Sequence, residues 1–476
     1  MHKSLPAIAS LVLPSLVLLA GCAAPRRQTY SQPPASPAPP AWNTGGTAPD
    51  AQADAGAPAA ADLKWQEFFT DGKLRQAIQL ALTNNRDLRL AALNVEKVQA
   101  QYRLQRAAQY PTVTAGASVD AYRMPADMTK DDKAYISNSN RVGAQISSWE
   151  VDLFGRVRSL KAQALEQYLA TEQGRIASQI SLVASVASSY LSLAGDRESL
   201  RLAQATLEAQ KATYDMVRRT RDLGIKSDLD LTQTLSQVQS AEVDVVSYTA
   251  QLTLDENALN LLVGAPVPAD LLPDGLGTDQ ALRDVAAGLP SSVLLRRPDI
   301  VQAEHQLKAA YANIDVARAA FFPRIYLTGS GGFLSGALQQ LFSLRALTWE
   351  FAPQVTLPIF DAGTRKTNYR IAQVDRDTAV ADYEKAIQTA FREVSDSLSQ
   401  RTRLLERQNA QQALVNTLDQ TYRLTEARYK AGIDNYLSVL VAQRSLYSGQ
   451  QSLVSLRLLR LTNLVTLYKV MGGGGV

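Results

Sequence analysis

Two long stretches without proline constrain the fold of this 476-residue chain more than any other feature. No proline occurs between Pro125 and Pro266, and none follows Pro358. Proline breaks helices because its ring removes a backbone donor and collides with the preceding turn, so these stretches are free to form very long helices. Residues from about 156 to 222 are expected to form one helix of roughly 100 Å.

The apolar residues of the helical segments recur in steps of three and four, which is the spacing of a coiled-coil seam. After Asp87 they are Leu88, Ala91, Val95, Val98 and Tyr102, and in the longer stretch they are Ile176, Ile180, Val183, Ala187, Tyr190 and Ala194, followed by Leu202, Ala205, Ala209, Ala212 and Met216. Alanine lets helices approach closely, so we expect helices that pack side by side over their length. Several shorter helices with breaks at Gly174 or Gly195 are the alternative.

The sequence contains an internal repeat. The segment "QKATYDMVRRTRDLGIKSDLDL" at 210–231 returns as "DQTYRLTEARYKAGIDNYLSVL" at 419–440, with Gly224 aligned to Gly432. A glycine at the end of a long helical pattern is typical of a helix C-cap or a tight turn. Gly224 and Gly432 are therefore predicted to close one long helix and open the next, as in an αα-hairpin.

A different periodicity lies between the helices of each half. Apolar and polar residues alternate, for example Trp349 and Phe351 with Thr348 and Glu350. A period of two with one apolar face predicts strands, expected at about 112–122, 141–153, 324–333 and 346–358. Segments of about 9 to 11 residues with one apolar and one polar face suit a transmembrane barrel with a wet lumen. A soluble antiparallel sheet is the alternative.

Four strands cannot close a barrel in a membrane, because each open edge leaves backbone groups unsatisfied in lipid. Small membrane barrels begin at about eight strands, so the chain must share its barrel with copies of itself. The expected fold class is mainly α with membrane β. Long antiparallel coiled-coil helices would form a trimeric α-barrel, and four strands per chain would contribute to a shared β-barrel of twelve strands.

The N-terminus carries a secretion signal. Lys3 supplies a positive charge, Leu5 to Leu19 supply an apolar region, and Leu-Ala-Gly precedes Cys22, the only cysteine of the chain. "LAGC" matches the lipobox of bacterial lipoproteins, so residues 1–21 are expected to be removed and Cys22 to carry covalent lipid, including palmitate. Ala23, rather than an aspartate, favours the outer membrane by resemblance to lipoprotein sorting signals. A short membrane anchor and a stray cysteine in a cleaved signal are the alternatives.

Composition excludes most catalytic chemistry. Because His2 lies in the signal, the mature chain keeps one histidine, His305, which we interpret as a helix-surface residue. It has no second thiol for a disulfide or a thiolate metal site, and no nucleophile elbow, phosphate-binding loop or dinucleotide fingerprint. The formal net charge of +4 argues against nucleic acid as a partner. We expect no enzyme, no metal and no cofactor apart from the lipid on Cys22.

Several segments carry a resemblance to a known family. They are "WQEFFTDGKLRQAIQLALTNNRDLRLA", "DLFGRVRS", "LPSSVLLRRPDI", "LPIFDAGTR" and "RYKAGIDNYLSVLVAQRSLY". Over about residues 62–474 the chain resembles the TolC-like outer-membrane factors, which are outer-membrane efflux proteins, and specifically their lipoprotein branch typified by OprM. The resemblance implies a homotrimer whose twelve-stranded outer-membrane barrel continues into a periplasmic α-barrel.

The resemblance also implies a function. The chain would be the outer-membrane exit channel of a tripartite efflux pump and would passively conduct drugs or other small toxic compounds to the exterior. Its partners would be a periplasmic adaptor and an inner-membrane transporter, expected to be proton-driven. A protein-secretion or heavy-metal export duct, a structural envelope lipoprotein and a peptidoglycan-processing enzyme are the alternatives. The last would need a catalytic constellation that we do not find.

The expected organisation has five parts. They are a signal peptide at 1–21, a lipidated Pro/Ala-rich tether at 22–61, a first repeat at 62–264, a connecting equatorial segment at 265–297 and a second repeat at 298–476. The tether lacks the large apolar residues that offset the entropy of ordering.

A continuous tube must narrow at one end so that it does not leak at rest, and the helix turns are the expected place. In the resembling proteins the second tip carries an arginine–tyrosine pair, an apolar constriction and acidic residues. The matching positions are Arg428, Tyr429, Leu437 and Asp434, and Asp228 and Asp230 at the first tip would add negative charge. Val441 stands where the resemblance implies an acid. The alternative is that Leu437 is a seam residue and that the charges are solvated caps.

Overall fold

The structure is a computed structural model. It describes Pro25, Gln28, 30–39, Trp42, 63–277, Leu282 and 291–473. Cys22, the expected signal peptide and most of the expected tether lie outside the described residues. The chain forms two compact units: the first comprises residues up to Ala35, Val95–Thr171 and Gln302–Tyr383, and the second comprises Ser36–Asn94, Glu172–Val301 and Glu384–Val476. Each unit therefore takes segments from both sequence repeats.

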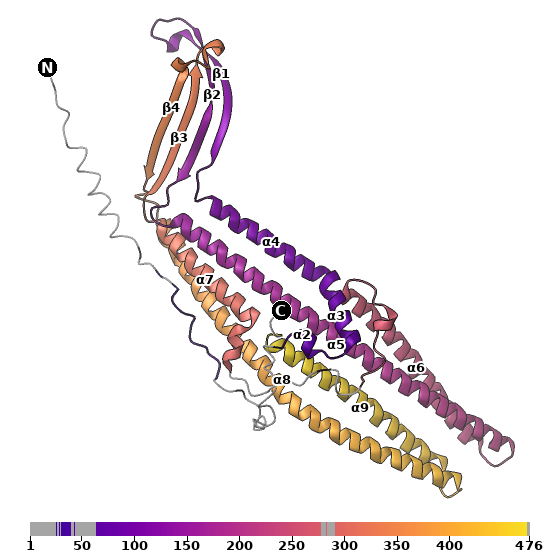
Figure 1. Cartoon of the computed structure of the whole chain (residues 1–476). Coiled ribbons are helices and arrows are strands. Elements are labelled where there is room, and N and C mark those ends of the chain that lie inside the picture. Colours follow the sequence, from indigo (N-terminus) through magenta and orange to yellow (C-terminus); the bar gives the residue numbers. More distant parts are fainter. Residues whose placement is uncertain are drawn as a thin grey trace. The chain divides into compact units, whose positions relative to one another are not determined.

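The order of elements repeats along the chain (Figure 1). Two short helices, α2 (Trp65–Phe68) and α3 (Gly72–Asn84), come first. The first half then has α4 (Arg86–Ala107), β1 (Val113–Met124), β2 (Tyr135–Glu150), α5 (Arg156–Asp222) and α6 (Asp228–Val263). The second half has α7 (Pro298–Ala319), β3 (Arg324–Ser335), β4 (Leu347–Thr356), α8 (Thr364–Lys430) and α9 (Tyr436–Val470). Short 3-10 helices lie at Ala126–Met128, Ala269–Leu271, Ser291–Arg296, Leu338–Gln340 and Leu344–Ala346.

The long helix predicted from the proline-free stretch is confirmed. Helix α5 has 67 residues, as has its repeat equivalent α8. It continues through Gly174 and Gly195, so the alternative of several shorter helices is wrong. Gly195 has a packing role instead, because a Cβ there would lie 3.2 Å from Cδ2 of Leu458 on α9.

The predicted seam of α5 is buried only in the N-terminal part of the helix. Ile180, Val183, Ala187, Tyr190 and Ala194 are buried, whereas Ala205, Ala209, Ala212 and Met216 are exposed. In the C-terminal part of the helix the buried residues are Ala203, Gln210 and Val217, which are seven residues apart. The helix therefore has a second small-residue row that the described residues of its own chain do not cover.

The sheet has the two faces that the alternation predicted. Among the described residues, four antiparallel strands pair in the order β1-β2-β3-β4. Directly paired residues lie on the same face of the sheet, so the register shows which side chains share each face. One row across the sheet is Ala117, Val142, Phe333 and Leu347, and a row on the other face is Thr114, Gln145, Ser330 and Glu350.

The strand limits differ slightly from the prediction. Strand β2 begins at Tyr135, earlier than the expected start near residue 141, because its first residues pair with β1 although they are mostly polar. A bulge interrupts its pairing with β3 between Ile146 and Trp149, where Ser148 has a φ of 52°. Strands β1 and β4 form the two edges of the sheet, and Trp349 on β4 is 78 % exposed.

The second unit has an aromatic core where α2 meets the end of α9. The rings of Phe68 and Tyr468 stack with centroids 4.4 Å apart, and Phe69 meets Phe68 edge-on. All three side chains are buried. Aromatic pairs of this kind add about 0.5–1.5 kcal/mol beyond the area that they bury, so this core holds α2 on α9.

Part of the range expected to be a tether contacts helix α7 within the first unit. The Tyr30 hydroxyl donates to Oε1 of Glu304 at 2.9 Å, and its ring meets Tyr311 edge-on. The Arg318 Nε donates to the carbonyl oxygen of Pro25 at 2.6 Å. Composition did not predict these contacts, because they depend on a few residues in a segment poor in large side chains.

Candidate functional site at the helix tips

Both long hairpins turn at a glycine with a left-handed backbone. The φ angle is 76° at Gly224 and 74° at Gly432. At the first tip the Ile225 N–H donates to the Thr220 carbonyl at 3.0 Å, and the Gly224 N–H donates to the Arg221 carbonyl at 2.8 Å. The equivalent two bonds close α8. This is the Schellman arrangement, in which a residue with positive φ follows the helix.

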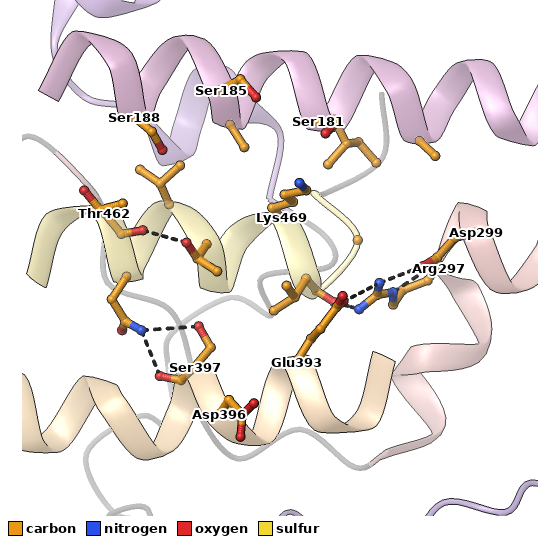
Figure 2. Close-up of a pocket in the computed structure, with 18 of the residues that line it drawn as sticks. Ser181, Ser185, Ser188, Arg297, Asp299, Glu393, Asp396, Ser397, Thr462 and Lys469 are labelled. Atoms are coloured by element: carbon orange, nitrogen blue, oxygen red, sulfur yellow. Dashed lines mark hydrogen bonds and ion pairs between the residues drawn. The ribbon is translucent and has the colours of Figure 1, made fainter. Parts of the chain in front are cut away.

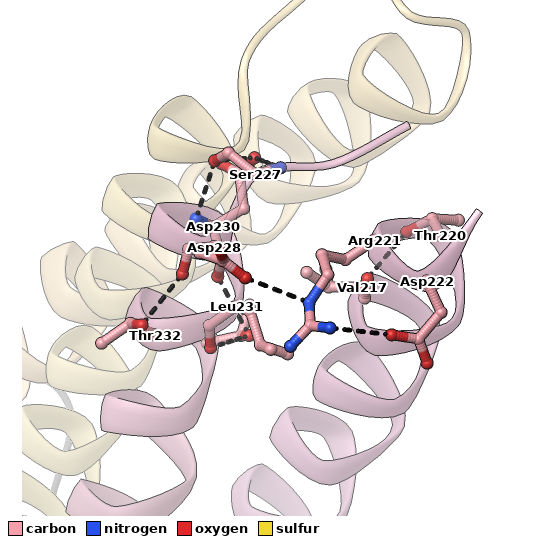
Figure 3. Close-up of polar contacts among 10 residues, drawn as sticks. Val217, Thr220, Arg221, Asp222, Ser227, Asp228, Asp230, Leu231 and Thr232 are labelled. Carbon is pink, nitrogen blue, oxygen red and sulfur yellow. Dashed lines mark hydrogen bonds and ion pairs between the residues drawn. The ribbon is translucent and has the colours of Figure 1, made fainter. Parts of the chain in front are cut away.

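At the first tip an arginine crosses the turn (Figure 3). The Arg221 Nη1 lies 3.0 Å from Oδ1 of Asp222, and its Nε lies 3.1 Å from Oδ1 of Asp228, the first residue of α6. The charge of Asp228, one of the expected aperture acids, is therefore balanced by the end of α5.

Asp230 has a structural partner as well. Its carboxylate accepts from the Ser227 N–H at 3.2 Å and from the Ser227 hydroxyl at 2.9 Å, while Ser227 Oγ accepts from the Asp230 N–H at 3.2 Å. This reciprocal arrangement is a capping box, and N-caps stabilise helices by about 1 kcal/mol. Asp230 therefore helps to cap the N-terminal end of α6 as well as lying at the tip.

At the second tip Arg428 and Asp434 form a two-bond ion pair. The Nε–Oδ2 distance is 2.6 Å, and the Nη2–Oδ1 distance is 3.0 Å. The hydrogen bonds from Arg428 lower the pKa of Asp434 below its ordinary value. Because both groups are in contact with water, salt screens the pair, and it remains a reversible link between the end of α8 and the turn.

The tyrosine of the expected arginine–tyrosine pair lies inside a small apolar core. Tyr429 is 8 % exposed and Tyr436 is 2 % exposed, and their ring centroids are 5.5 Å apart. Val439, Leu440 and the partly buried Tyr422 complete the cluster. Burial raises the pKa of Tyr436 to about 12. The second tip is therefore a rigid element, whereas Arg428 beside it is exposed.

The expected apolar constriction faces outward in the single chain. Leu437 is 54 % exposed, and Val441, one turn further along α9, is 57 % exposed. The position at which the resemblance implied an acid is thus part of an exposed apolar row. Leu437 lies away from the buried cluster that contains its neighbour Tyr436.

Sequence reasoning missed a contact between the tips. The Nζ of Lys226, in the first turn, lies 4.3 Å from the ring centroid of Tyr429. The repeat aligns Lys226 with Asp434 and Arg221 with Tyr429, but this alignment does not indicate that Lys226 and Tyr429 meet. The two tips therefore carry different chemistry at equivalent positions.

A groove of about 720 Å³ lies in the second unit between α5, α8 and α9. Figure 2 shows Ser181, Ser185 and Ser188 on α5, Glu393, Asp396 and Ser397 on α8, and Thr462 and Lys469 on α9. At its end the buried Arg297 donates to the Val470 carbonyl at 2.7 Å and to Glu393 at 2.9 Å. Arg297 therefore joins the C-terminal end of α9 to α8.

The groove is lined in part by polar side chains but contains no recognisable reaction centre. Its lining contains no histidine or cysteine, and no group of three potential metal ligands occurs in the part of the chain that the structure describes. His305 lies elsewhere, on α7, where its Nδ1 is 2.6 Å from Oε2 of Glu166 on α5. It is half-buried and paired, rather than the surface residue that the sequence suggested.

A sheet with one apolar and one polar face, joined to long helical hairpins, is the architecture of a channel that crosses an outer membrane. A family model described as outer membrane efflux protein matches residues 77–265 and 289–473. The chain belongs to this outer membrane efflux protein family.

Individual relatives agree with the family match. The chain is 46 % identical over 461 residues to a toluene efflux pump outer membrane protein, TtgC, of Pseudomonas putida, covering 96 % of this chain and 93 % of TtgC. It is 45 % identical to the antibiotic efflux pump outer membrane protein ArpC of Pseudomonas putida, covering 100 % and 96 %. The open state of the Neisseria gonorrhoeae MtrE outer membrane channel superimposes with a TM-score of 0.84 at 36 % identity, covering 94 % and 98 %.

These findings confirm the expected fold class, function and location. The protein is an outer-membrane efflux channel with a helical barrel, a β-barrel contribution from four strands and a large periplasmic portion. The family consists of transport channels.

Proposed function

We propose that the chain works as a homotrimer and forms the exit duct of a tripartite pump. The observation that carries this proposal is the open sheet: its edges are β1 and β4, and one of its faces carries apolar residues from all four strands. Unpaired backbone groups cost several kcal/mol each in hydrocarbon. Pairing β1 of one copy with β4 of the next removes both edges, and three copies give the expected twelve strands.

Exposed apolar rows on the helices support the same assembly. On α4, Leu90, Leu93 and Leu104 are exposed, while the predicted seam on the other side is half-buried. On α6, Leu254 and Leu261 are also exposed. Rows of this kind along a helix mark a contact with another helix, and a head-to-tail contact that repeats around an axis closes a ring.

The proposed partners are a periplasmic adaptor and a proton-driven inner-membrane transporter. Relatives at 45–46 % identity are named for the efflux of antibiotics and toluene, so the proposed cargo is small apolar and amphiphilic compounds. The duct conducts them passively, with no catalytic step and no cofactor apart from covalent lipid.

The proposed lipid is attached at Cys22. The Pro25 carbonyl bonds to Arg318, near the C-terminal end of α7, where the chain passes on to β3. Pro25 follows Cys22 by three residues, so the contact with Arg318 lies close in sequence to the proposed lipid. Mass spectrometry of the mature N-terminus checks this: Cys22→Ser should lose the acyl mass, and an unmodified wild-type cysteine would refute the attachment.

The proposed aperture is formed by the helix tips. Leu437 would narrow the bore, and the Arg428–Asp434 pair would hold the second tip in its closed form, with Tyr429 as its rigid support. Asp228 and Asp230 would add acidic surface. Leu437→Ala and Arg428→Ala should each raise single-channel conductance in planar bilayers. If both conducted like the wild type, the constriction would lie elsewhere.

Two measurements test the assembly and its role. Protein extracted in mild detergent should contain three chains per particle, and cysteines placed at Thr112 and Pro358 should cross-link between neighbours. Cells that lack the protein should accumulate amphiphilic dyes and solvents. A stable monomer with a closed barrel would overturn the trimer, and normal tolerance of all such compounds would overturn the pump assignment.

A further inference from the structure

The loop between β3 and β4 leaves three large apolar side chains uncovered. It spans residues 336–346, between the end of one strand and the start of the next. Leu338 is 63 % exposed, Phe342 is 75 % exposed and Leu344 is 90 % exposed. Single exposed apolar residues are normal on a protein surface, but several in one short loop mark a contact surface.

The backbone of this loop is held in place. Leu341 and Ala346 are buried. The Ala346 N–H donates to the Ser343 carbonyl at 2.9 Å, and the Ala337 N–H donates to the Ser335 hydroxyl at 3.2 Å. A loop with its own buried residues and hydrogen bonds presents its exposed side chains in a defined direction.

The contact of Phe342 shows on which face of the sheet the loop lies. Its ring meets the ring of Phe333 edge-on, with centroids 5.9 Å apart. Phe333 is paired with Val142 and Leu347 in the apolar row of the sheet. The apolar face of an outer-membrane barrel meets the hydrocarbon of the bilayer, so the loop continues the lipid-facing surface.

The strand register shows where that apolar face ends. The row of Phe333 is followed, in the direction away from the helices, by a row on the same face that consists of Val119, Asn140 and Ser335. Asn138 comes next on this face of β2. The face therefore turns polar directly beyond Phe333, and a loop in contact with that last apolar row lies at the level of the lipid headgroups.

Arg345 adds a positive charge to the same loop. It follows Leu344 directly, and its side chain is exposed. A cation at a membrane surface attracts the anionic groups of lipids. Apolar side chains next to a cation are typical of segments that lie in a membrane interface.

We propose that residues 336–346 are an outer anchor loop. Leu338, Phe342 and Leu344 insert among the acyl chains of the outer leaflet, and Arg345 binds the phosphate groups of the lipids there. The outer anchor loop rests on the proposed barrel, because the sheet meets lipid on one face only when copies of the chain close it. The loop then fixes the depth of each copy in the membrane.

The β1–β2 turn provides matched control positions. Met128 is 72 % exposed, much like Phe342, and Lys130 in the same turn is an exposed cation, like Arg345. Strand β1 continues past the polar row to Met124, and both control residues follow that end. We expect them to lie in water beyond the headgroups.

The first test is the accessibility of a nitroxide label on the full chain in vesicles of phosphatidylcholine and phosphatidylglycerol. A label on Leu344→Cys should collide mainly with oxygen, which concentrates in lipid, whereas a label on Met128→Cys should collide mainly with a water-soluble nickel chelate. The wild type, labelled in parallel, gives the background from Cys22. A label at position 344 that meets mainly the nickel chelate overturns the proposal. A label that neither reagent reaches places the loop against a neighbouring copy and overturns it too.

The second test is the lipid that particles retain when they are extracted from the same vesicles. Arg345→Met should retain about fivefold less phosphatidylglycerol, relative to phosphatidylcholine, than the wild type. Lys130→Met should retain lipid like the wild type. Unchanged retention in Arg345→Met, or an equal loss in Lys130→Met, overturns the phosphate contact.

The assembly of the wild type separates the two proposals. A wild type that forms no heat-resistant particle in these vesicles overturns the proposed trimer, and the outer anchor loop with it. An assembled wild type, together with a water-exposed label at position 344 in an equally assembled variant, overturns the outer anchor loop alone.

Discussion

Arg428 and Asp434 are joined by two hydrogen bonds across the turn at Gly432, with Nε–Oδ2 and Nη2–Oδ1 distances of 2.6 and 3.0 Å. The Arg428 carbonyl also accepts the Ile433 N–H at 2.9 Å. One residue thus fixes the turn through its backbone and its side chain. Bidentate pairs have a defined geometry, so a partner that opens this tip must either move the turn as a unit or break both bonds.

The Arg428–Asp434 pair should resist mild acid. Arg428 lowers the pKa of Asp434, so the pair stabilises the closed tip at all pH values above the ordinary aspartate pKa of about 3.9. Its contribution is lost only as the pH falls through the lower, folded-state value. Wild-type conductance should therefore stay constant between pH 7 and pH 5, whereas Asp434→Asn should conduct more than the wild type at both values. Opening of the wild type at pH 5 with no effect of Asp434→Asn would refute this role.

Alanine at either turn glycine should destabilise the protein. The positive φ of Gly224 and Gly432 places the backbone in a region that costs other L-residues about 1 kcal/mol or more. No neighbouring atom lies within 4 Å of a Cβ at either site, so the cost is conformational. Gly224→Ala and Gly432→Ala should lower the melting temperature of the extracted protein. Gly72→Ala is the control, because that glycine has the same open surroundings without a positive φ, and an equal loss there would refute the explanation.

Gly143 allows β2 and β3 to approach each other closely. A Cβ at Gly143 would lie 2.6 Å from the carbonyl oxygen of Gly331, and backbone cannot move aside as a side chain can. Gly143→Ala should therefore reduce the yield of assembled, heat-resistant particles on semi-native gels. Gly116 pairs with Gly143 across β1, but a Cβ there meets nothing within 4 Å, so Gly116→Ala should assemble normally. Equal assembly of both variants would contradict the proposed crowding.

The fold was predictable from sequence where the signal is local. Helix α5 runs from Arg156 to Asp222 as expected, because a helical period and the absence of proline act within one segment. The start of β2 was not, because its first residues are mostly polar and join the sheet only by pairing with β1. The C-terminal row of α5 from Ala205 to Met216, which was expected to be a seam, is exposed among the described residues of the chain.

The sequence predicted where the candidate site lies better than it predicted which side chains contact one another there. The repeat located both turns, and the spacing of Ser227 and Asp230 is that of a capping box, which sequence alone would have revealed. The contact of Lys226 with Tyr429 could not be read from sequence, because it depends on how two hairpins from opposite halves of the chain pack.

Asp196 should make stability fall with rising pH. Burial, and then the hydrogen bond with Asp255, raises the pKa of Asp196 to about 7. Since the folded-state pKa lies above the ordinary value of about 3.9, the folded protein holds a proton that the unfolded chain releases. This contribution is complete below about pH 4 and is lost progressively as the pH rises through 7.

Asp196→Asn removes the titrating group and keeps its shape, so it should melt at a higher temperature than the wild type at pH 8 and at nearly the same temperature at pH 5. The expected gain at pH 8 is about 1 kcal/mol, because Asp196 is partly exposed and solvent screens the repulsion. Asp222→Asn serves as the control, since it changes an exposed carboxylate paired with Arg221. The comparison must be made as a difference between variants, because other carboxylates titrate in the same range. If Asp196→Asn and the wild type differed equally at both pH values, the two carboxyl groups would not share a proton.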